Sequence, residues 1–245
     1  MRRQLGYIGD SETPFNLNFK NYGDRLLTEY GLAQIDKDRV GVIIGTGVGG
    51  IHTLEEQHTI LKNKGPRRVS PYFVPKMIAN IAAGQIAIKY GFEGPNQTII
   101  SACASATDAI GYGLRLLRAG DADVIITGGS EASVSPMPMA GFANMKALTN
   151  FDGNPECASK PFDLNRSGFV MGEGAGFLVL ETEKHAKKRG AEIFAELAGY
   201  GSTDDAYHVT KPVEGGKGAI NAMKLALKDG KLNLEDINYI NAHGT

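Results

Sequence analysis

The chain has 245 residues, of which 42% are hydrophobic and 22% charged, and its formal net charge at pH 7 is −1. These values are ordinary for a globular protein with one large or two modest domains, and they do not favour a nucleic-acid partner or an anionic membrane surface. With two cysteines, no signal peptide and no apolar run near about 18 residues, the sequence predicts a cytoplasmic protein without a disulfide framework or a membrane span.

Residues 1–39 give few structural signals. Basic, glycine and asparagine residues are mixed there, and only residues 22–30 have the pattern of a short helix. We therefore interpret residues 1–39 as an atypical or truncated N-terminal segment, and we expect the folded domain to span residues 40–245.

The first predicted strand, residues 40–44, leads into a glycine-rich turn at residues 45–50. The turn has the spacing GxGxxG, which also occurs in dinucleotide-binding proteins. That fingerprint needs in addition an acidic residue about 20 positions further on, to bind the ribose. Residues 62–70 contain no acidic side chain, so the sequence disfavours dinucleotide binding without excluding it.

A basic cluster follows the glycine-rich turn, and after it a loop leads into a predicted helix within residues 71–90. The cluster consists of Lys62, Lys64, Arg67 and Arg68. A run of charge is usually a solvated face, but it also fits the docking of an acidic partner. The residues alone leave both interpretations open.

The strongest signal lies in residues 98–120. A β-branched run enters a group of small residues around Cys103 and continues as an amphipathic helical pattern, and a second apolar run follows at residues 124–127. Strand, helix and strand in about 30 residues predict a βαβ unit with parallel strands. Cys103 should then lie at a helix N-terminus, where a thiolate is favoured. The alternative is a buried, inert cysteine.

The rest of the chain is predicted to alternate between strands and helices. We expect a polar loop at residues 150–160 and then a glycine-rich segment at residues 168–176, which leads into a strand at residues 177–181. A basic helix is expected at residues 183–189 and a further helix at residues 218–228. Two further strands are expected at residues 194–199 and 237–240. His243 follows the last strand, and like Cys103 it lies beyond a strand's C-terminal end, where α/β sheets place ligand sites. His208 is expected to be a satisfied loop histidine, and the five histidines show no metal-ligand spacing.

Five segments, in this order, resemble the beta-ketoacyl-acyl-carrier-protein synthases, the condensing enzymes of the thiolase-like fold. They are SACASATDAIG, GDADVIITGGSEA, PFDLNRSGFVMGEGAG, DAYHVTKP and NAHGT. The resemblance covers roughly residues 40–245 and points to the type II, long-chain elongating synthases. It implies an α/β chain with the first half of the thiolase-like fold, built from layered helices and a mixed, largely parallel sheet, together with the first strand of the second half.

The resemblance also implies a function in fatty acid biosynthesis. Cys103 would accept an acyl chain, and its backbone N–H would help form an oxyanion hole. His243 would be one of two imidazole donors that hold the enolate formed when a malonyl thioester loses CO2. Further positions match residues of the family that contact the acyl chain or the pantetheine arm: Val48, Phe73, Val74, Phe142, Thr210 and Thr245. Among these, Val48 would limit chain length, and Phe73 and Val74 would reach the acyl pocket of a dimer partner.

The implied partners are an acyl-carrier protein and, in the complete enzyme, a second copy of the chain. Arg67, Arg68 and Lys146 match carrier-docking positions. The substrates would be carried on the phosphopantetheine of the carrier protein, with no cofactor or metal bound to the chain.

The chain departs from the family pattern in three respects. The family normally begins with an apolar strand and a glycine-rich turn, which residues 1–39 lack; it usually has Asp at the position of Ser167; and it often has His at the position of Asp108. The family's second active-site His, a Lys and a Gly/Phe loop come later than Thr245, so we expect a fragment with part of the site. The alternatives are a non-catalytic ketosynthase-like subunit that binds only a partner or carrier, and a degradative thiolase, which GEGAG together with NAHGT disfavours.

Overall fold

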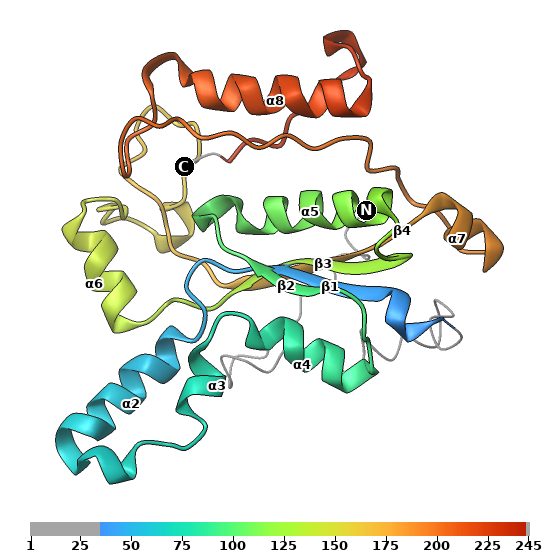
Figure 1. The fold of residues 1–245 in the computed structure, drawn as a ribbon. Helices are drawn as coiled ribbons and strands as arrows, with labels where there is room; N and C mark the ends of the chain where they lie inside the picture. The colour runs from blue at the N-terminus through green and yellow to red at the C-terminus, as the bar shows by residue number, and fades with distance from the viewer. Residues whose placement is uncertain (1–34, 244–245) are drawn as a thin grey trace.

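The computed structural model describes residues 35–243, which are built around a four-stranded sheet (Figure 1). The strands are β1 (Val40–Gly45), β2 (Asn96–Ile99), β3 (Val124–Glu131) and β4 (Gly174–Glu181). Their order across the sheet is β2-β1-β3-β4. β1 pairs in parallel with β2 and β3, and β4 is antiparallel to β3. The predicted mixed, largely parallel α/β sheet is therefore confirmed.

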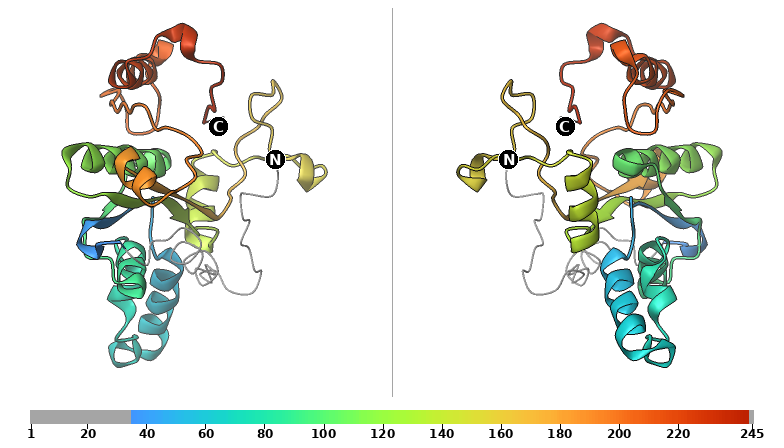
Figure 2. Two further views of the ribbon diagram at one scale, coloured as in Figure 1. Left: turned by 90° about the vertical axis from the view of Figure 1, so that its right-hand side faces the viewer. Right: turned by 90° about the vertical axis from the view of Figure 1, so that its left-hand side faces the viewer.

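Helices cover both faces of the sheet. The α-helices are α2 (Ile51–Lys64), α3 (Phe73–Met77), α4 (Ile81–Tyr90), α5 (Ser105–Ala119), α6 (Pro136–Asn144), α7 (Glu183–Lys188) and α8 (Lys217–Gly230). Short 3-10 helices are η2 (Lys37–Arg39), η3 (Pro66–Arg68), η4 (Ala102–Ala104), η5 (Pro155–Cys157), η6 (Glu214–Gly216) and η7 (Leu234–Asp236). Figures 1 and 2 show α4 and α5 on opposite faces of the sheet, with α8 as a further layer beyond α5. No helix within residues 35–243 is both long enough and apolar enough to cross a membrane.

The core lies on both faces of β1 because alternate side chains of a strand point to opposite sides. Val42 and Ile44 pack toward α4, while Ile43 packs with Ile125 toward α5. These side chains are at most 1% exposed. Burial of a side chain of this size stabilises the fold by about 1.5–3 kcal/mol. The sheet is thereby fixed between the two helices, and its C-terminal edge holds the loops that matter for function.

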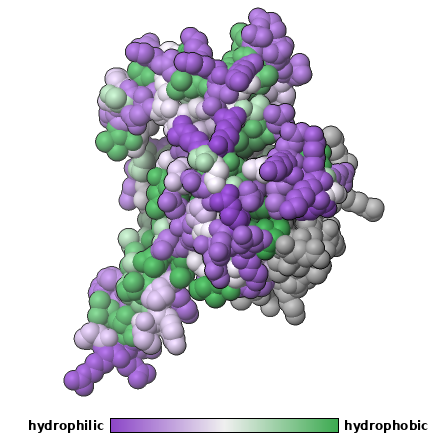
Figure 3. Space-filling view, turned by 45° about the vertical axis from the view of Figure 1, so that its right-hand side comes forward, coloured by the Kyte–Doolittle hydropathy of each residue, from purple (hydrophilic) through white to green (hydrophobic). Residues whose placement is uncertain are grey.

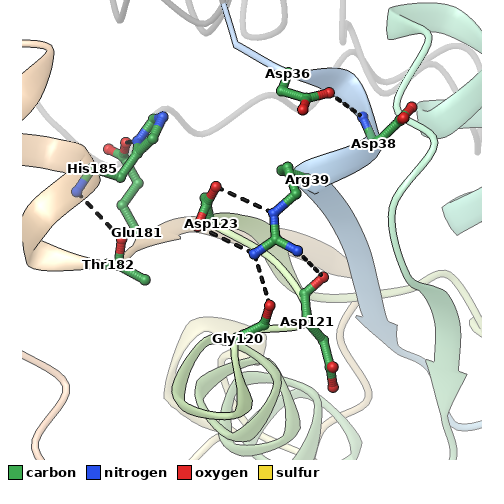
Figure 4. A network of polar contacts seen from close by, with 9 residues as sticks. All are labelled: Asp36, Asp38, Arg39, Gly120, Asp121, Asp123, Glu181, Thr182 and His185. Carbon is green, nitrogen blue, oxygen red and sulfur yellow. Dashed lines mark hydrogen bonds and ion pairs between the residues drawn. The ribbon is translucent and has the colours of Figure 1, made fainter.

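An arginine stabilises the end of the sheet where β1 begins, opposite the edge that holds the functional loops (Figure 4). Arg39, just before β1, donates from Nη2 to the Gly120 carbonyl oxygen at 2.7 Å and from Nη1 to the Asp121 carbonyl oxygen at 3.3 Å. Its Nε lies 3.3 Å from Oδ2 of Asp123. These contacts join the turn between α5 and β3 to the start of β1.

Two predicted strands are wrong. Residues 194–199 and 237–240 have no regular secondary structure, although both are rich in apolar residues. Phe194 is 66% exposed and Tyr239 is 80% exposed. A strand forms only where a neighbour pairs with its backbone N–H and C=O groups, and no segment within residues 35–243 pairs with these two. The expected first strand of a second half is therefore not a strand in the described part of the chain.

A half-buried ion network joins β4 to α7 (Figure 4). Glu181 accepts a hydrogen bond from Arg189 Nε at 2.8 Å, and its Oε1 lies 2.7 Å from Nδ1 of His185. Its side chain is 10% exposed. Burial alone would raise the pKa of Glu181, but the hydrogen bonds from Arg189 and His185 outweigh burial and hold that pKa below its ordinary value.

Because the folded-state pKa of Glu181 is lowered, its ionised form stabilises the fold above the unfolded pKa of about 4.3. We expect this stabilisation to be lost as the pH falls through the lower, folded-state pKa. Thermal unfolding measured between pH 7 and pH 3 should show a shallower fall in Tm for Glu181→Gln than for the unmodified chain. Glu156→Gln, which removes an exposed loop carboxylate without an ion-pair partner among the described residues, is the control and should leave the slope nearly unchanged. Equal slopes for the unmodified chain and Glu181→Gln would contradict this assignment.

Candidate active site

Cys103 lies in η4, between the end of β2 and the start of α5, as the sequence predicts. Its side chain is a free thiol and the residue is exposed. Burial, the alternative left open by the sequence, is therefore wrong. The other cysteine, Cys157, is also free and exposed, but it lies in η5, in the polar loop that follows α6.

The turn that presents Cys103 is held in an uncommon backbone conformation. Ala102 has φ +52°, in the left-handed region, which costs a non-glycine residue about 1–3 kcal/mol. Ser105 offsets this cost, because its hydroxyl donates to the Ala102 carbonyl oxygen at 2.7 Å and accepts from the Ser101 amide at 2.9 Å. The Ala104 amide donates to the Ser101 carbonyl oxygen at 3.1 Å. These local hydrogen bonds stabilise the turn.

Two glycines allow this turn to sit directly on the sheet. A Cβ atom added to Gly45, at the end of β1, would lie 2.3 Å from the backbone carbon of Ser105. A Cβ atom on Gly129 in β3 would lie 2.7 Å from Cβ of Ala106. Any side chain at either position would push the start of α5 away from the sheet.

The glycine-rich turn after β1 is occupied by a carboxylate of the chain itself. Oε2 of Glu131, the last residue of β3, accepts hydrogen bonds from the Gly47 amide at 2.6 Å and the Val48 amide at 3.0 Å. Its other oxygen accepts from the Ser133 hydroxyl at 2.7 Å. In a dinucleotide site such N–H groups bind phosphate. Here Glu131 takes that place, which gives a direct physical argument against the dinucleotide interpretation of GxGxxG.

The Cys103 turn and the Val48 turn leave the same edge of the sheet. Gly45 of β1 and Ile99 of β2 are paired in register, so the two turns start from neighbouring strands. Val48 is 52% exposed, which excludes a role as a core residue. A pocket of about 350 Å³, including space open to solvent, lies beneath the glycine-rich turn against α3 and α4. Gly49 and Gly50 of the glycine-rich turn line this pocket, whereas Cys103 and Val48 do not.

The other predicted substrate contacts are scattered over several elements. Phe73 begins α3, and Val74 beside it is 55% exposed. Phe142 on α6 packs edge-to-face on Phe169, with the ring centroids 5.2 Å apart. Thr210 is exposed, within the loop before η6. Thr245 lies outside the described residues.

His208 is a satisfied loop histidine, as predicted. Its Nδ1 accepts hydrogen bonds from the backbone amides of Thr210 and Lys211, each at 3.1 Å. The imidazole thereby shapes the loop that contains Thr210.

His243, the last described residue, is exposed. Among the described residues, neither the Cys103 thiol nor the His243 imidazole has a hydrogen-bond partner, so the structure does not join the two groups. Nor do residues 35–243 contain a cluster of three or more His, Cys, Asp or Glu that could hold a metal ion.

The predicted docking cations lie on two connected parts of the molecule. Arg67 and Arg68 are exposed in η3, at the tip of the arm formed by α2 and α3, and Figure 3 shows hydrophilic residues at this tip. Lys146 is exposed just beyond α6. The two parts are joined by Glu55 of α2, whose Oε1 accepts from the Ser135 hydroxyl at 2.9 Å at the start of α6.

Sequence reasoning missed three residues that shape the site: Glu131, Asp108 and Tyr200. Asp108 in the first turn of α5 accepts hydrogen bonds from the Ser101 hydroxyl and from the Tyr200 hydroxyl, the latter at 2.5 Å. Glu131 could have been identified from the sequence, because it lies at the end of a strand next to a glycine-rich turn. Tyr200 had no such signal, because it is 92 positions away from Asp108.

Family models match nearly the whole chain. A model described as the beta-ketoacyl synthase N-terminal domain matches residues 14–186, and one described as the C-terminal domain matches residues 194–245.

Curated relatives share about half of the aligned residues. A 3-oxoacyl-(acyl-carrier-protein) synthase 2 from Rhizobium meliloti is 46% identical over 236 residues, covering 95% of this chain and 56% of the relative. Proteins of the same name from Synechocystis sp. and Staphylococcus aureus are each 50% identical, covering 86% and 85% of this chain and 51% of each relative. The chain thus spans about half the length of the curated relatives it matches.

Solved structures have the same fold. A type II PKS acyl-carrier protein in complex with its ketosynthase bound to the hexaketide matches with TM-score 0.82 and 36% identity, over 86% of this chain and 53% of that one. A beta-ketoacyl synthase from Burkholderia phymatum matches with TM-score 0.82 and 35% identity, over 89% and 54%. A ketosynthase in complex with its chain length factor from Xenorhabdus doucetiae matches with TM-score 0.73 and 28% identity, over 90% and 52%.

We expect Glu131→Ala to lower the free energy of unfolding by about 1–3 kcal/mol, because the amides of Gly47 and Val48 lose a charged acceptor. Hydrogen exchange of residues 46–49 should accelerate at the same time. Urea unfolding and peptide-level exchange measure the two effects. Glu156→Ala, which removes an exposed loop carboxylate, serves as the matched control and should change neither quantity. Unchanged exchange in Glu131→Ala would show that the carboxylate does not hold the turn.

Proposed function

Because the chain belongs to the beta-ketoacyl synthase family, we propose that it supplies the nucleophile-bearing part of a 3-oxoacyl-acyl-carrier-protein synthase of fatty acid biosynthesis. The observation that supports this most is the exposed Cys103 thiol at a strand-to-helix junction, in a chain 46% identical to a synthase of that name. Fatty acid synthesis is favoured over a polyketide pathway because of the sequence identities. The type II PKS ketosynthase structure is 36% identical to this chain, whereas the 3-oxoacyl-(acyl-carrier-protein) synthases 2 of Rhizobium meliloti and Synechocystis sp. are 46% and 50% identical.

The proposed reaction has two stages. In the first, the Cys103 thiolate attacks the carbonyl carbon of an acyl thioester; a new C–S bond forms and the phosphopantetheine thiolate leaves and takes up a proton. In the second, a malonyl thioester loses CO2, and the resulting enolate carbon attacks the acyl-Cys103 carbonyl. The C–S bond to Cys103 breaks, and the product is a 3-oxoacyl thioester on the carrier.

The residues of the chain would hold the charge that develops in these steps. The Cys103 N–H is a donor for the oxyanion, and His243 is one of the two imidazole donors for the enolate. The resemblance places the second imidazole beyond Thr245. A joint site therefore requires His243 to approach Cys103, a contact that does not occur among the described residues.

The proposed substrate and partner contacts are those that the family resemblance implies. Val48 limits the acyl chain, Phe142 lines its pocket, and Thr210 and Thr245 contact the pantetheine arm. Phe73 and Val74 extend toward a second copy of the chain. No cofactor is bound permanently, and the cytoplasmic location expected from the sequence belongs to the same proposal.

The carrier protein is proposed to dock on Arg67, Arg68 and Lys146. All three are exposed cations, and Glu55 fastens their supporting elements together. One similar solved structure contains an acyl-carrier protein bound to its ketosynthase, which supports a carrier protein as the class of partner.

A second candidate is a non-catalytic subunit that binds a ketosynthase or a carrier protein. The lack of a hydrogen bond between Cys103 and His243 in the described structure favours it, and one similar structure contains a ketosynthase with a chain length factor. The two candidates differ in whether the chain forms an acyl-enzyme and releases CO2.

We expect incubation with an acyl-carrier protein loaded with a long-chain acyl group to add the mass of that group to the chain. The modification should be absent in Cys103→Ala and retained in Cys157→Ala, because Cys157 is exposed but lies in a different loop. Intact-mass spectrometry measures both. An unmodified Cys103 would favour the non-catalytic subunit, and release of labelled CO2 from malonyl-carrier protein would exclude it.

A further inference from the structure

One face of α5 holds a tyrosine from a distant part of the chain. Tyr200 lies in the irregular segment between α7 and η6. Its ring occupies the space that a side chain at Gly111 of α5 would fill, because a Cβ atom added to Gly111 would lie 2.2–2.4 Å from the ring atoms. The guanidinium carbon of Arg115, one turn further along α5, lies 5.0 Å from the ring centroid. Asp108, one turn before Gly111, accepts the Tyr200 hydroxyl at 2.5 Å.

The same carboxylate is bonded to the turn that presents the nucleophile. The Ser101 hydroxyl donates to the second oxygen of Asp108, and Ser101 is two residues before Cys103. Ser101 also anchors the turn through its backbone, since its amide donates to the Ser105 hydroxyl. Asp108 therefore connects Tyr200 on one side with the Cys103 turn on the other.

Further contacts hold the tyrosine in place. Its amide donates to Oδ2 of Asp229 on α8 at 2.9 Å, and Arg118 of α5 bonds both that carboxylate and the Ala198 carbonyl oxygen. Burial and the hydrogen bond to Asp108 raise the pKa of Tyr200 above its ordinary value, so the hydroxyl remains a donor at neutral pH. The outer layer with α8 is thus connected to α5 through the same segment.

We propose that Asp108 is a positioning residue for Cys103, which holds the nucleophile turn through Ser101, and that Tyr200 braces Asp108 from the segment beneath α8. The proposal rests on the nucleophile role of Cys103 in the proposed function. Asp108 does not touch Cys103, so it acts only through the hydrogen bond to Ser101.

The test uses the full chain with three substitutions that each preserve the size of the side chain or nearly so. Asp108→Asn removes the charge, and Tyr200→Phe removes only the hydroxyl that donates to Asp108. Tyr112→Phe is the matched control, since Tyr112 lies on the same helix and its hydroxyl has no hydrogen-bond partner among the described residues. Cys157 is the internal control for reagent access and global unfolding, because it is exposed and lies outside this network.

Peptide-level hydrogen exchange across residues 100–106 tests the positioning role, because the exchange rate measures how firmly this turn is held. We expect exchange there to accelerate several-fold in Asp108→Asn and in Tyr200→Phe and to be unchanged in Tyr112→Phe. If Tyr200 serves only to hold α8, exchange rises in residues 198–201 and α8 but not in the turn, and that result overturns the proposal.

Site-resolved alkylation with iodoacetamide at one fixed pH tests how the turn presents the thiol. In Asp108→Asn the ratio of the Cys103 rate to the Cys157 rate should change at least twofold, whereas Tyr112→Phe should leave it unchanged. An unchanged ratio in Asp108→Asn would overturn the assignment. Neither measurement requires acyl transfer, so both can succeed even if the chain proves to be a non-catalytic subunit.

Discussion

The close contact between the start of α5 and the side-chain-free ends of β1 and β3 determines where the rest of the site lies. Gly45 and Gly129 are paired in register, and both face the first turn of α5. Because no Cβ separates the layers, the helix begins directly on the sheet, and the turn before it is forced outward. The exposure of Cys103 and the left-handed conformation of Ala102 both follow from this contact. The local hydrogen bonds of Ser105 then make that conformation stable.

Much of the fold could be predicted because its signals are local. A β-branched run and an amphipathic pattern are properties of neighbouring residues, and they located β1, α5 and β3 as well as the junction that contains Cys103. The two wrong strands have the same apolar character, but a strand also requires a partner, and its partner is not encoded in the strand itself. Residues 194–199 and 237–240 therefore have the propensity of strands without the pairing.

The candidate site was less predictable, since its supporting contacts join distant parts of the chain. Glu131 and Gly47 are 84 positions apart, and Asp108 and Tyr200 are 92. The sequence argument against a dinucleotide relied on a missing acidic residue after the glycine-rich turn. The structure supplies a different reason, an internal anion from β3 that saturates the same N–H groups. The position of the nucleophile was encoded locally, but the residues that hold it were not.

The pocket on α5 that receives the Tyr200 ring has a mechanical consequence for the outer layer. Asp108 and Arg115 stand one helical turn to either side of Gly111, so the ring is confined along the helix axis in both directions. A one-turn slide of the segment under α8 would force the ring against one of these two side chains. The tyrosine therefore fixes the register between α5 and the segment beneath α8.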